Sequence, residues 1–257
     1  MKIVVDIREI QAFILVFLRV GGILLFAPIL GPKGTPWVLK VTLAVLTTLL
    51  IAPFAPRPPL LKGLEDFLAR AASEAVIGMV LGFAIHLIFG AVQTAGQMIG
   101  YQMGFSMVNL LDPQGEYPIP IISHFVTMLA VLIFLDLNGH HWYITAIAKS
   151  YKVLGPEGGR LSQGLGRELL QQGGRLFVAA TRIAAPLMVL IFLFYVAMAL
   201  VARAMPQMNV FIVALPLQVG IGLVGLGLSL PFMAAFIKGL FGGLKGELGL
   251  LLKAMGG

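Results

Sequence analysis

Histidines and acidic residues are the side chains best able to do chemistry in this chain, but their spacing does not favour catalysis. His140 and His141 are adjacent in the sequence LNGHH, so on a helix they point about 100° apart and cannot both hold one metal ion well. Asp136 lies nearby but does not complete a metal site, and the sequence contains no cysteine. The sequence motifs of zinc proteases, serine hydrolases and phosphate-binding loops are also missing. We therefore expect no metal, no cofactor and no enzymatic activity.

Three ionisable residues lie inside strongly apolar stretches: Arg19, His86 and Arg182. An isolated charge inside a membrane is costly, so residues of this kind are functional candidates by default. The apolar stretches contain no acid to pair with either arginine, which leaves backbone carbonyls, the membrane interface or a carboxylate of another subunit as partners. We expect all three residues to be structural, with a neutral His86 hydrogen-bonded to a neighbouring helix. A proton relay would need acidic companions in other spans.

Glycine is the most over-represented residue, with 31 in 257 positions, whereas average usage is about 7%. Gly78 and Gly82 form a GxxxG pair, and Gly96, Gly100 and Gly104 repeat the spacing in AGQMIGYQMG. Four-residue spacing puts such glycines on one stripe of a helix, where a second helix backbone can approach closely. We predict helix packing at the first four of these glycines, against a helix of this chain or of another subunit.

The segment Ala95–Pro120 mixes apolar and polar residues in an unusual way. It follows a long apolar stretch, yet it contains several amides and acids, and its prolines and glycines then break regular structure. Methionines such as Met103 and Met107 are flexible and polarisable, so they can seal irregular gaps and move aside. Two hypotheses follow: a deformable plug across a conduit, or a re-entrant loop packed in the protein core.

The composition indicates that these residues are carried by membrane helices. Hydrophobic residues make up 59% of the chain and charged residues 11%, against about 45–50% and about 25% in an ordinary globular domain. This excludes a water-soluble enzyme, a disordered protein and a nucleic-acid-binding domain. The net charge of +7 fits basic loops beside membrane spans.

Runs without charged residues predict an all-α membrane protein of about six long hydrophobic helices, arranged as hairpins in a single domain over residues 1–257. A helix crosses the membrane with about 20 apolar residues. The run Ala75–Leu111 has 37 residues, so it should hold a helix and a connection shielded by other protein surface. Most Lys and Arg fall on the side of the two termini, which predicts that both termini are cytoplasmic. The predicted spans are 10–30, 38–54, 75–95, 119–135, 180–202 and 210–237.

Three motifs closely resemble the FliR family, a membrane component of the flagellar type III protein-export gate. They are AGQMIGYQMGFSMVNLLDPQ (Ala95–Gln114), LNGHH (Leu137–His141) and ARAMPQMNVFIVALPLQVGIGL (Ala202–Leu223). The resemblance covers nearly the whole chain, including the LRVGGILLFAPILG stretch at Leu18–Gly31. It implies a location in the bacterial cytoplasmic (inner) membrane, in the flagellar basal body. It also implies a first part similar to the P-type gate subunit and a last hairpin similar to the Q-type subunit.

The resemblance further implies partners and a gate. The expected partners are FliP-like and FliQ-like gate subunits, an FlhB-like switch protein, unfolded export substrates and membrane lipid, with no nucleic acid. The subunits of such a complex enclose a narrow conduit for unfolded substrates, and a loop of this subunit plugs the closed pore. The residues that match this plug loop are Gly104, Phe105, Ser106, Met107, Val108, Asn109, Leu110, Leu111, Asp112, Pro113, Gln114 and Gly115.

Three alternatives to a flagellar gate subunit stay open at this point. An injectisome T-type subunit belongs to the same class, and neighbouring flagellar or secretion genes would separate the two. A small-solute transporter would have paired charges or broken helices around a site at the membrane midplane, and the acid-free spans argue against it. A purely structural membrane scaffold would not need a loop that seals gaps.

Overall fold

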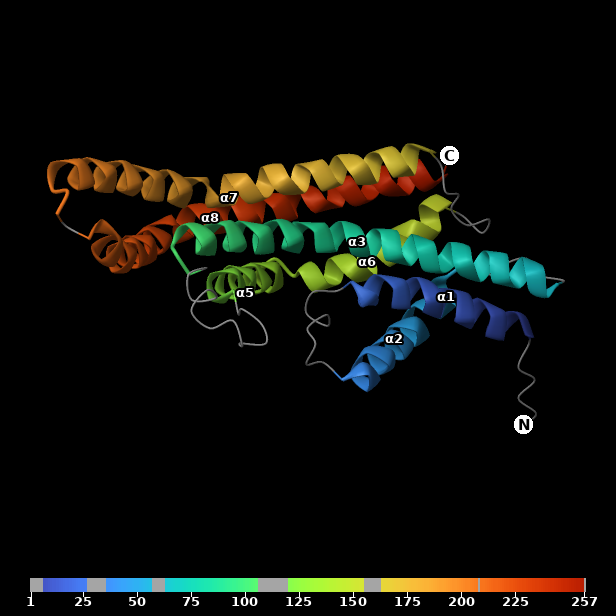
Figure 1. Ribbon diagram of the computed structural model, residues 1–257. Helices are drawn as coiled ribbons and strands as arrows, with labels where there is room; N and C mark the ends of the chain where they lie inside the picture. Colours follow the sequence, from blue (N-terminus) through green and yellow to red (C-terminus); the bar gives the residue numbers. More distant parts are fainter. Residues whose placement is uncertain are drawn as a thin grey trace. The chain divides into compact units, whose positions relative to one another are not determined.

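The computed structural model describes residues 7–26, 36–56, 63–105, 120–154, 163–207 and 209–256. These ranges are helical and contain no strand, so the predicted all-α class is confirmed. The elements, labelled in Figure 1, are α1 (Ile7–Leu25), α2 (Trp37–Ile51), the 3₁₀ turn η1 (Ala52–Phe54), α3 (Leu64–Gln102), α5 (Ile121–Asp136), α6 (Gly139–Leu154), α7 (Gln163–Ala204) and α8 (Val210–Gly256).

Three of the helices are much longer than a simple membrane span. Helix α3 has 39 residues, α7 has 42 and α8 has 47; at about 1.5 Å per residue α3 alone measures about 58 Å. Helix α3 begins before the apolar run because Glu65 and Asp66 lie in its first turn, where acids interact favourably with the helix dipole. Pro186 in α7, and Pro216 and Pro231 in α8, lie inside their helices.

Four helical segments of the described chain are long and apolar enough to cross a membrane. They are Trp37–Phe54, Leu64–Gln102, Gly164–Ala204 and Ile212–Gly256, and the bent pair of α5 and α6 makes a fifth if it is one span. In the most apolar stretch of α3, 61% of the residues are buried, against 28% in α7 and α8. Helix α3 is therefore the most enclosed of the four, and fewer than a third of the residues in the most apolar stretches of the others are buried.

The chain divides into two compact units. Unit 1 consists of Met1–Ile88, Phe134–Gly173 and Phe241–Gly257, and unit 2 consists of Phe89–Ile133 and Gly174–Leu240. Helices α3, α5, α7 and α8 contribute residues to both units.

In unit 1, α1 contacts α2 and α6 and crosses α3 at a glycine contact. A Cβ atom on Gly22 would lie 2.8 Å from the amide nitrogen of Met79, and one on Gly82 would lie 2.7 Å from the carbonyl oxygen of Ile23. A Cβ atom on Gly78 would meet the carbonyl oxygen of Arg19 even more closely. The two backbones therefore touch directly, and only glycine fits at these positions.

The LNGHH motif forms the break between α5 and α6. Asn138 has a φ of 54°, a left-handed conformation that asparagine tolerates better than most residues. A side chain at Gly139 would collide with the ring of Phe134. The turn is closed by the Asn138 amide donating to the Leu135 carbonyl at 2.9 Å. The asparagine of the motif is thus explained by its backbone conformation, and the glycine by the space that the Phe134 ring occupies.

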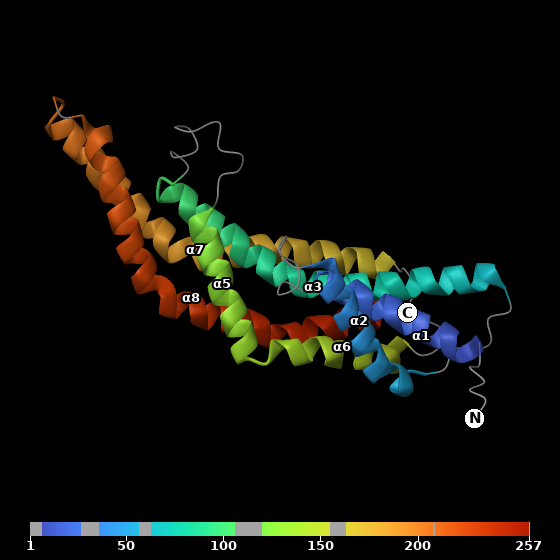
Figure 2. The ribbon, with the colours of Figure 1, turned by 90° about the horizontal axis from the view of Figure 1, so that it is seen from below.

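In unit 2, α3 packs on α5 and α8, and α7 packs on α8. A Cβ atom on Gly96 would collide with the backbone of Ser123, whose hydroxyl donates to the Gln93 carbonyl at 2.8 Å. Figure 2 shows α5 passing beside the last part of α3. A Cβ atom on Gly225 would collide with the side chain of Leu190, which marks the close contact between α8 and α7.

Candidate functional site

The candidate gate segment begins where α3 ends, at Gly104. Its φ of +87° is a left-handed conformation that glycine adopts without strain. The Gly104 amide donates to the Tyr101 carbonyl at 3.2 Å, and the Phe105 amide donates to the Gly100 carbonyl at 3.2 Å. These two bonds form a Schellman motif, a common way to end a helix. The first residue of the predicted plug is therefore also the stop signal of α3.

Two side chains from other helices bind the last carbonyl of α3. Gln218 of α8 donates a hydrogen bond from its side-chain amide to the Gln102 carbonyl and a second, of 2.7 Å, to the hydroxyl of Tyr195 on α7. The Tyr195 hydroxyl in turn donates to the Gln102 carbonyl at 3.5 Å. Three helices of unit 2 thus meet at one backbone oxygen.

Close packing surrounds this polar contact. Met103 is fully buried and lies over Gly222 of α8, where a Cβ atom would be 2.6 Å from the Met103 Cγ. A Cβ atom on Gly104 would be 3.1 Å from a methyl group of Leu215. The first and third motifs of the sequence analysis therefore meet here, 116 residues apart along the chain at Gln102 and Gln218.

Of the residues proposed for the plug, Gly104 and Phe105 are described, and 106–115 lie outside the described residues. Phe105 is half-buried.

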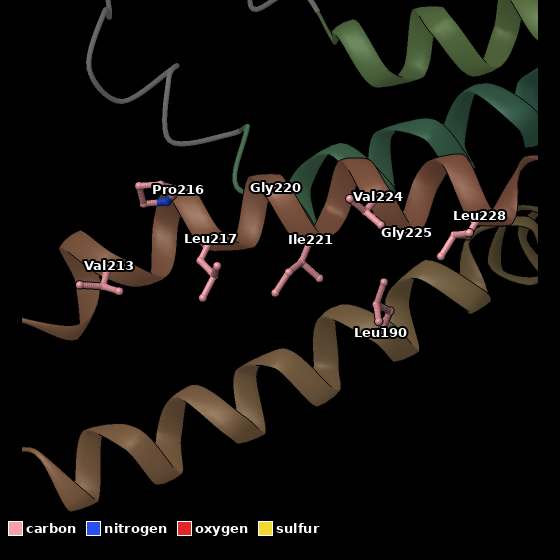
Figure 3. A pocket seen from close by; sticks show the side chains of 9 residues that line it. All are labelled: Leu190, Val213, Pro216, Leu217, Gly220, Ile221, Val224, Gly225 and Leu228. Atoms are coloured by element: carbon pink, nitrogen blue, oxygen red, sulfur yellow. The ribbon is translucent and has the colours of Figure 1, made fainter.

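Beyond the Gly225 contact, α7 and α8 enclose an open apolar groove of about 790 Å³. Figure 3 shows Leu217 and Ile221 of α8 pointing toward α7, and Leu190 of α7 pointing toward α8. The helices separate from there toward Val213. The groove can accept only apolar groups, because its lining residues are Leu190, Val213, Pro216, Leu217, Gly220, Ile221, Val224, Gly225 and Leu228.

Arg19 has a partner within the chain, so the expectation of none was wrong. Its guanidinium makes a two-pronged ion pair with Glu74 of α3, one contact being 2.8 Å. It also donates to the Ser150 hydroxyl at 2.8 Å and lies 3.9 Å from the centre of the Tyr151 ring. Arg19 is completely buried and Glu74 is 6% exposed. Glu74 directly precedes the charge-free run, and α3 extends far enough to carry it inside.

The other residues singled out in the sequence lie apart from this network. His86 is exposed on α3 with its ring 6.0 Å from that of Phe26, and Arg182 is exposed on α7. The rings of His140 and His141 are 4.3 Å apart. In the described part of the chain no group of three metal-binding side chains comes together. A Cβ atom on Gly100 would lie 3.7 Å from the Ile122 side chain, an ordinary contact distance rather than a tight one.

Five residues of these two clusters were not recognised from the sequence: Glu74, Ser150, Tyr151, Tyr195 and Gln218. Only Gln218 carries a usable signal, because it is the one amide within the apolar stretch from Val210 to Ile237. An uncompensated amide in such a position is costly, so its presence indicates a specific hydrogen-bond partner.

Comparison with known proteins identifies the family of the chain. Residues 10–244 match the family of bacterial export proteins, family 1. The flagellar biosynthetic protein FliR of Escherichia coli (strain K12) is 33% identical over 224 residues, which is 87% of this chain and 86% of that protein. FliR of Bacillus subtilis (strain 168) is 30% identical over 90% of both chains, and FliR of Aquifex aeolicus (strain VF5) is 32% identical over 86% of this chain and 85% of its own. The chain therefore belongs to the FliR family of bacterial export proteins.

Proposed function

We propose that this chain is a non-enzymatic gate subunit whose Gly104–Gly115 loop plugs the conduit for unfolded flagellar substrates. Membership of the FliR family makes the chain a flagellar biosynthesis and export subunit of the bacterial inner membrane, in the flagellar basal body. The matching relatives are named as flagellar proteins, which favours the flagellar system over an injectisome.

As an export subunit the chain works with other subunits of the export gate. We propose that these are FliP-like and FliQ-like subunits and an FlhB-like switch protein, and that the whole chain acts as one export-gate domain. Support comes from the apolar faces of α7 and α8, of whose most apolar residues only 28% are buried. Arg19, His86 and Arg182 are proposed to serve structure rather than transport.

The observation that carries the plug proposal is the fixed end of α3. The Schellman turn at Gly104 and the burial of Met103 give the loop a rigid starting point on α8. A loop that seals a pore benefits from an anchored end. Without one, more of the loop must be ordered each time it closes, and that ordering costs conformational entropy. Its apolar members can then seal against similar side chains of partner subunits.

The plug is tested by replacing residues 106–111 with an equal number of alternating Gly and Ser. This change keeps Phe105, whose amide closes the α3 turn, but removes the apolar side chains. We expect the complex with co-expressed gate subunits to assemble at normal yield and to conduct ions across planar bilayers in its resting state. Full burial of one apolar side chain contributes about 1.5–3 kcal/mol, so losing several should open the seal.

A matched control replaces residues 157–161, between α6 and α7, with the same kind of Gly–Ser segment. This variant should assemble and stay as tight as the unmodified complex. If the 106–111 variant assembles and is equally tight, the seal lies elsewhere and the plug proposal fails.

A further inference from the structure

The apolar groove between α7 and α8 lies in a part of unit 2 that has the length and composition of a membrane span. On α7, no charged residue occurs between Arg182 and Arg203, and both arginines are exposed. The 20 residues between them measure about 30 Å as a helix, which matches the hydrocarbon thickness of a bilayer. Leu190, the groove residue of α7, lies within this stretch. The groove is therefore at the depth of lipid tails.

The width of the groove changes along the two helices. They touch at Gly225, where a side chain would collide with Leu190, and they separate from there toward Val213 (Figure 3). The 12 residues from Val213 to Gly225 cover about 18 Å of helix, close to the roughly 15 Å that the tails of one leaflet occupy. A protein helix is about 10 Å wide along its whole length, so it does not fit a space that narrows to direct contact. A single hydrocarbon chain does.

No described segment of the chain covers the groove. Leu217 is 47% exposed and Val224 is 66% exposed, although both line it. All the lining residues are apolar, so a water molecule there would find too few polar partners. In a bilayer such a space is filled by hydrocarbon.

The charged residues of unit 2 complement an anionic headgroup. In the described part of this unit they are all basic: Arg175, Arg182, Arg203 and Lys238. Arg203 lies in the last turn of α7, at the end toward which the groove widens. No described residue forms an ion pair with it. It is 13 residues from Leu190, about 20 Å along the helix, and a guanidinium can donate two parallel hydrogen bonds to a phosphate.

We propose that the groove binds one acyl chain of an anionic phospholipid, whose headgroup phosphate pairs with Arg203. The tail runs from the open end of the groove toward Gly225 and covers the apolar side chains that the chain itself leaves exposed. The hairpin of α7 and α8 thus carries a lipid between its helices. This site is separate from the plug segment, and it stands or falls independently of the plug proposal.

The test uses the co-expressed gate complex in nanodiscs of phosphatidylcholine. A small fraction of the lipid is phosphatidylglycerol with a photoreactive diazirine in the lower half of one acyl chain, and the cross-linked residues are mapped by mass spectrometry. We expect cross-links at Leu190, Leu217 and Ile221. Their yield should exceed that of a phosphatidylcholine probe with the same chain about fivefold, because one basic residue near the membrane surface attracts an anionic lipid by about 1 kcal/mol.

Two variants test the two halves of the site. Leu217→Trp fills the groove and should abolish the cross-links at Leu190 and Ile221. Leu223→Trp is its matched control, because Leu223 is an exposed leucine of α8 outside the groove lining; it should leave the cross-links unchanged.

Arg203→Gln should lower the yield of the phosphatidylglycerol probe to that of the phosphatidylcholine probe. Arg182→Gln is its matched control, because it removes an exposed arginine at the other end of the same charge-free stretch. It should keep the preference for phosphatidylglycerol.

Three results would overturn the proposal. An unmodified complex without cross-links in the groove would show that a partner subunit covers it. Cross-links that persist in Leu217→Trp would come from lipid passing over the surface. Equal yields of the two probes would remove the pairing with Arg203. Should Leu217→Trp prevent assembly, the comparison of the two probes in the unmodified complex and in Arg203→Gln decides.

Discussion

At the scale of single residues, the buried pair of Arg19 and Glu74 ties α1 to α3, with Ser150 adding α6. Taking both charges out of a polar solvent is expensive, and their mutual attraction offsets much of that cost only while both are present. The guanidinium donates two hydrogen bonds to the Glu74 carboxylate, and it lies over the ring of Tyr151. The pair therefore mainly fixes the positions of the helices. Its effect on the free energy of unfolding becomes large when one partner is removed and the other charge stays buried.

We predict that Glu74→Leu and Arg19→Leu each destabilise the protein by about 3–5 kcal/mol, because each strands a buried charge. Arg19→Lys keeps the charge but loses the planar set of guanidinium donors, so it should destabilise the protein less than Arg19→Leu does. The measurement is the thermal unfolding midpoint of the purified gate complex.

The double variant with leucine at positions 19 and 74 is the control. It leaves no unpaired charge, so its midpoint should lie above those of the two single leucine variants. A double variant that is less stable than either single one would contradict the stranded-charge explanation.

At the scale of elements, α3 is positioned by glycines rather than by large side chains. Gly78 and Gly82 let α1 touch the first half of α3, and Gly96 lets α5 touch the second half. Other glycines, such as Gly227 of α8, have no atom of the described chain within 4 Å of a Cβ position. Contacts within the described part of the chain do not require glycine at that position.

We predict that Gly96→Ala disrupts unit 2 and Gly227→Ala does not. The new methyl group at position 96 would collide with the Ser123 backbone, and overpacking of this kind costs about 1–3 kcal/mol. At position 227 it meets open space and improves helix propensity by up to about 1 kcal/mol. The effect of each variant is measured as the protease resistance of the chain in isolated membranes. Equal resistance of the two variants would show that α3 and α5 separate easily.

The sequence predicts what depends on local signals. The all-α class follows from the apolar runs. The end of α3 at Gly104 does not, because Gly104 continues the four-residue spacing of Gly96 and Gly100, whereas its left-handed φ appears only in the structure. The role of Gln218 could not be predicted, because its partner is a backbone carbonyl that only the folded arrangement brings within reach. Glu74 escapes sequence reasoning for a related reason: it lies just outside the charge-free run, whereas α3 begins ten residues earlier, at Leu64.

At the scale of the whole molecule, much apolar surface stays uncovered by the chain itself. Phe192 is 62% exposed and Leu228 is 78% exposed. On α8, Gly239, Gly242 and Gly246 also have no described atom near their Cβ positions. Glycine is not needed where a helix faces lipid tails. It is needed where the backbone of a second helix approaches closely.

We therefore predict that the chain alone behaves poorly in detergent and becomes well behaved only with its gate partners. Size-exclusion chromatography should show a broad or aggregated profile for the chain expressed alone, and a single sharp peak after co-expression with the other gate subunits. A monodisperse monomer that unfolds cooperatively would count against this expectation.

Unit 1 has a further consequence for biosynthesis, because it combines the first, middle and last parts of the chain. Proteins generally fold from the N-terminus as the ribosome makes them. The buried side chains of Phe241, Leu244 and Leu251, however, are made near the end of translation. Phe241 packs on Phe134 and Trp142, so this part of unit 1 stays incompletely packed until nearly the whole chain has been made. A premature stop before codon 241 deletes only the final stretch of the protein, yet it removes core residues from the unit that was begun first.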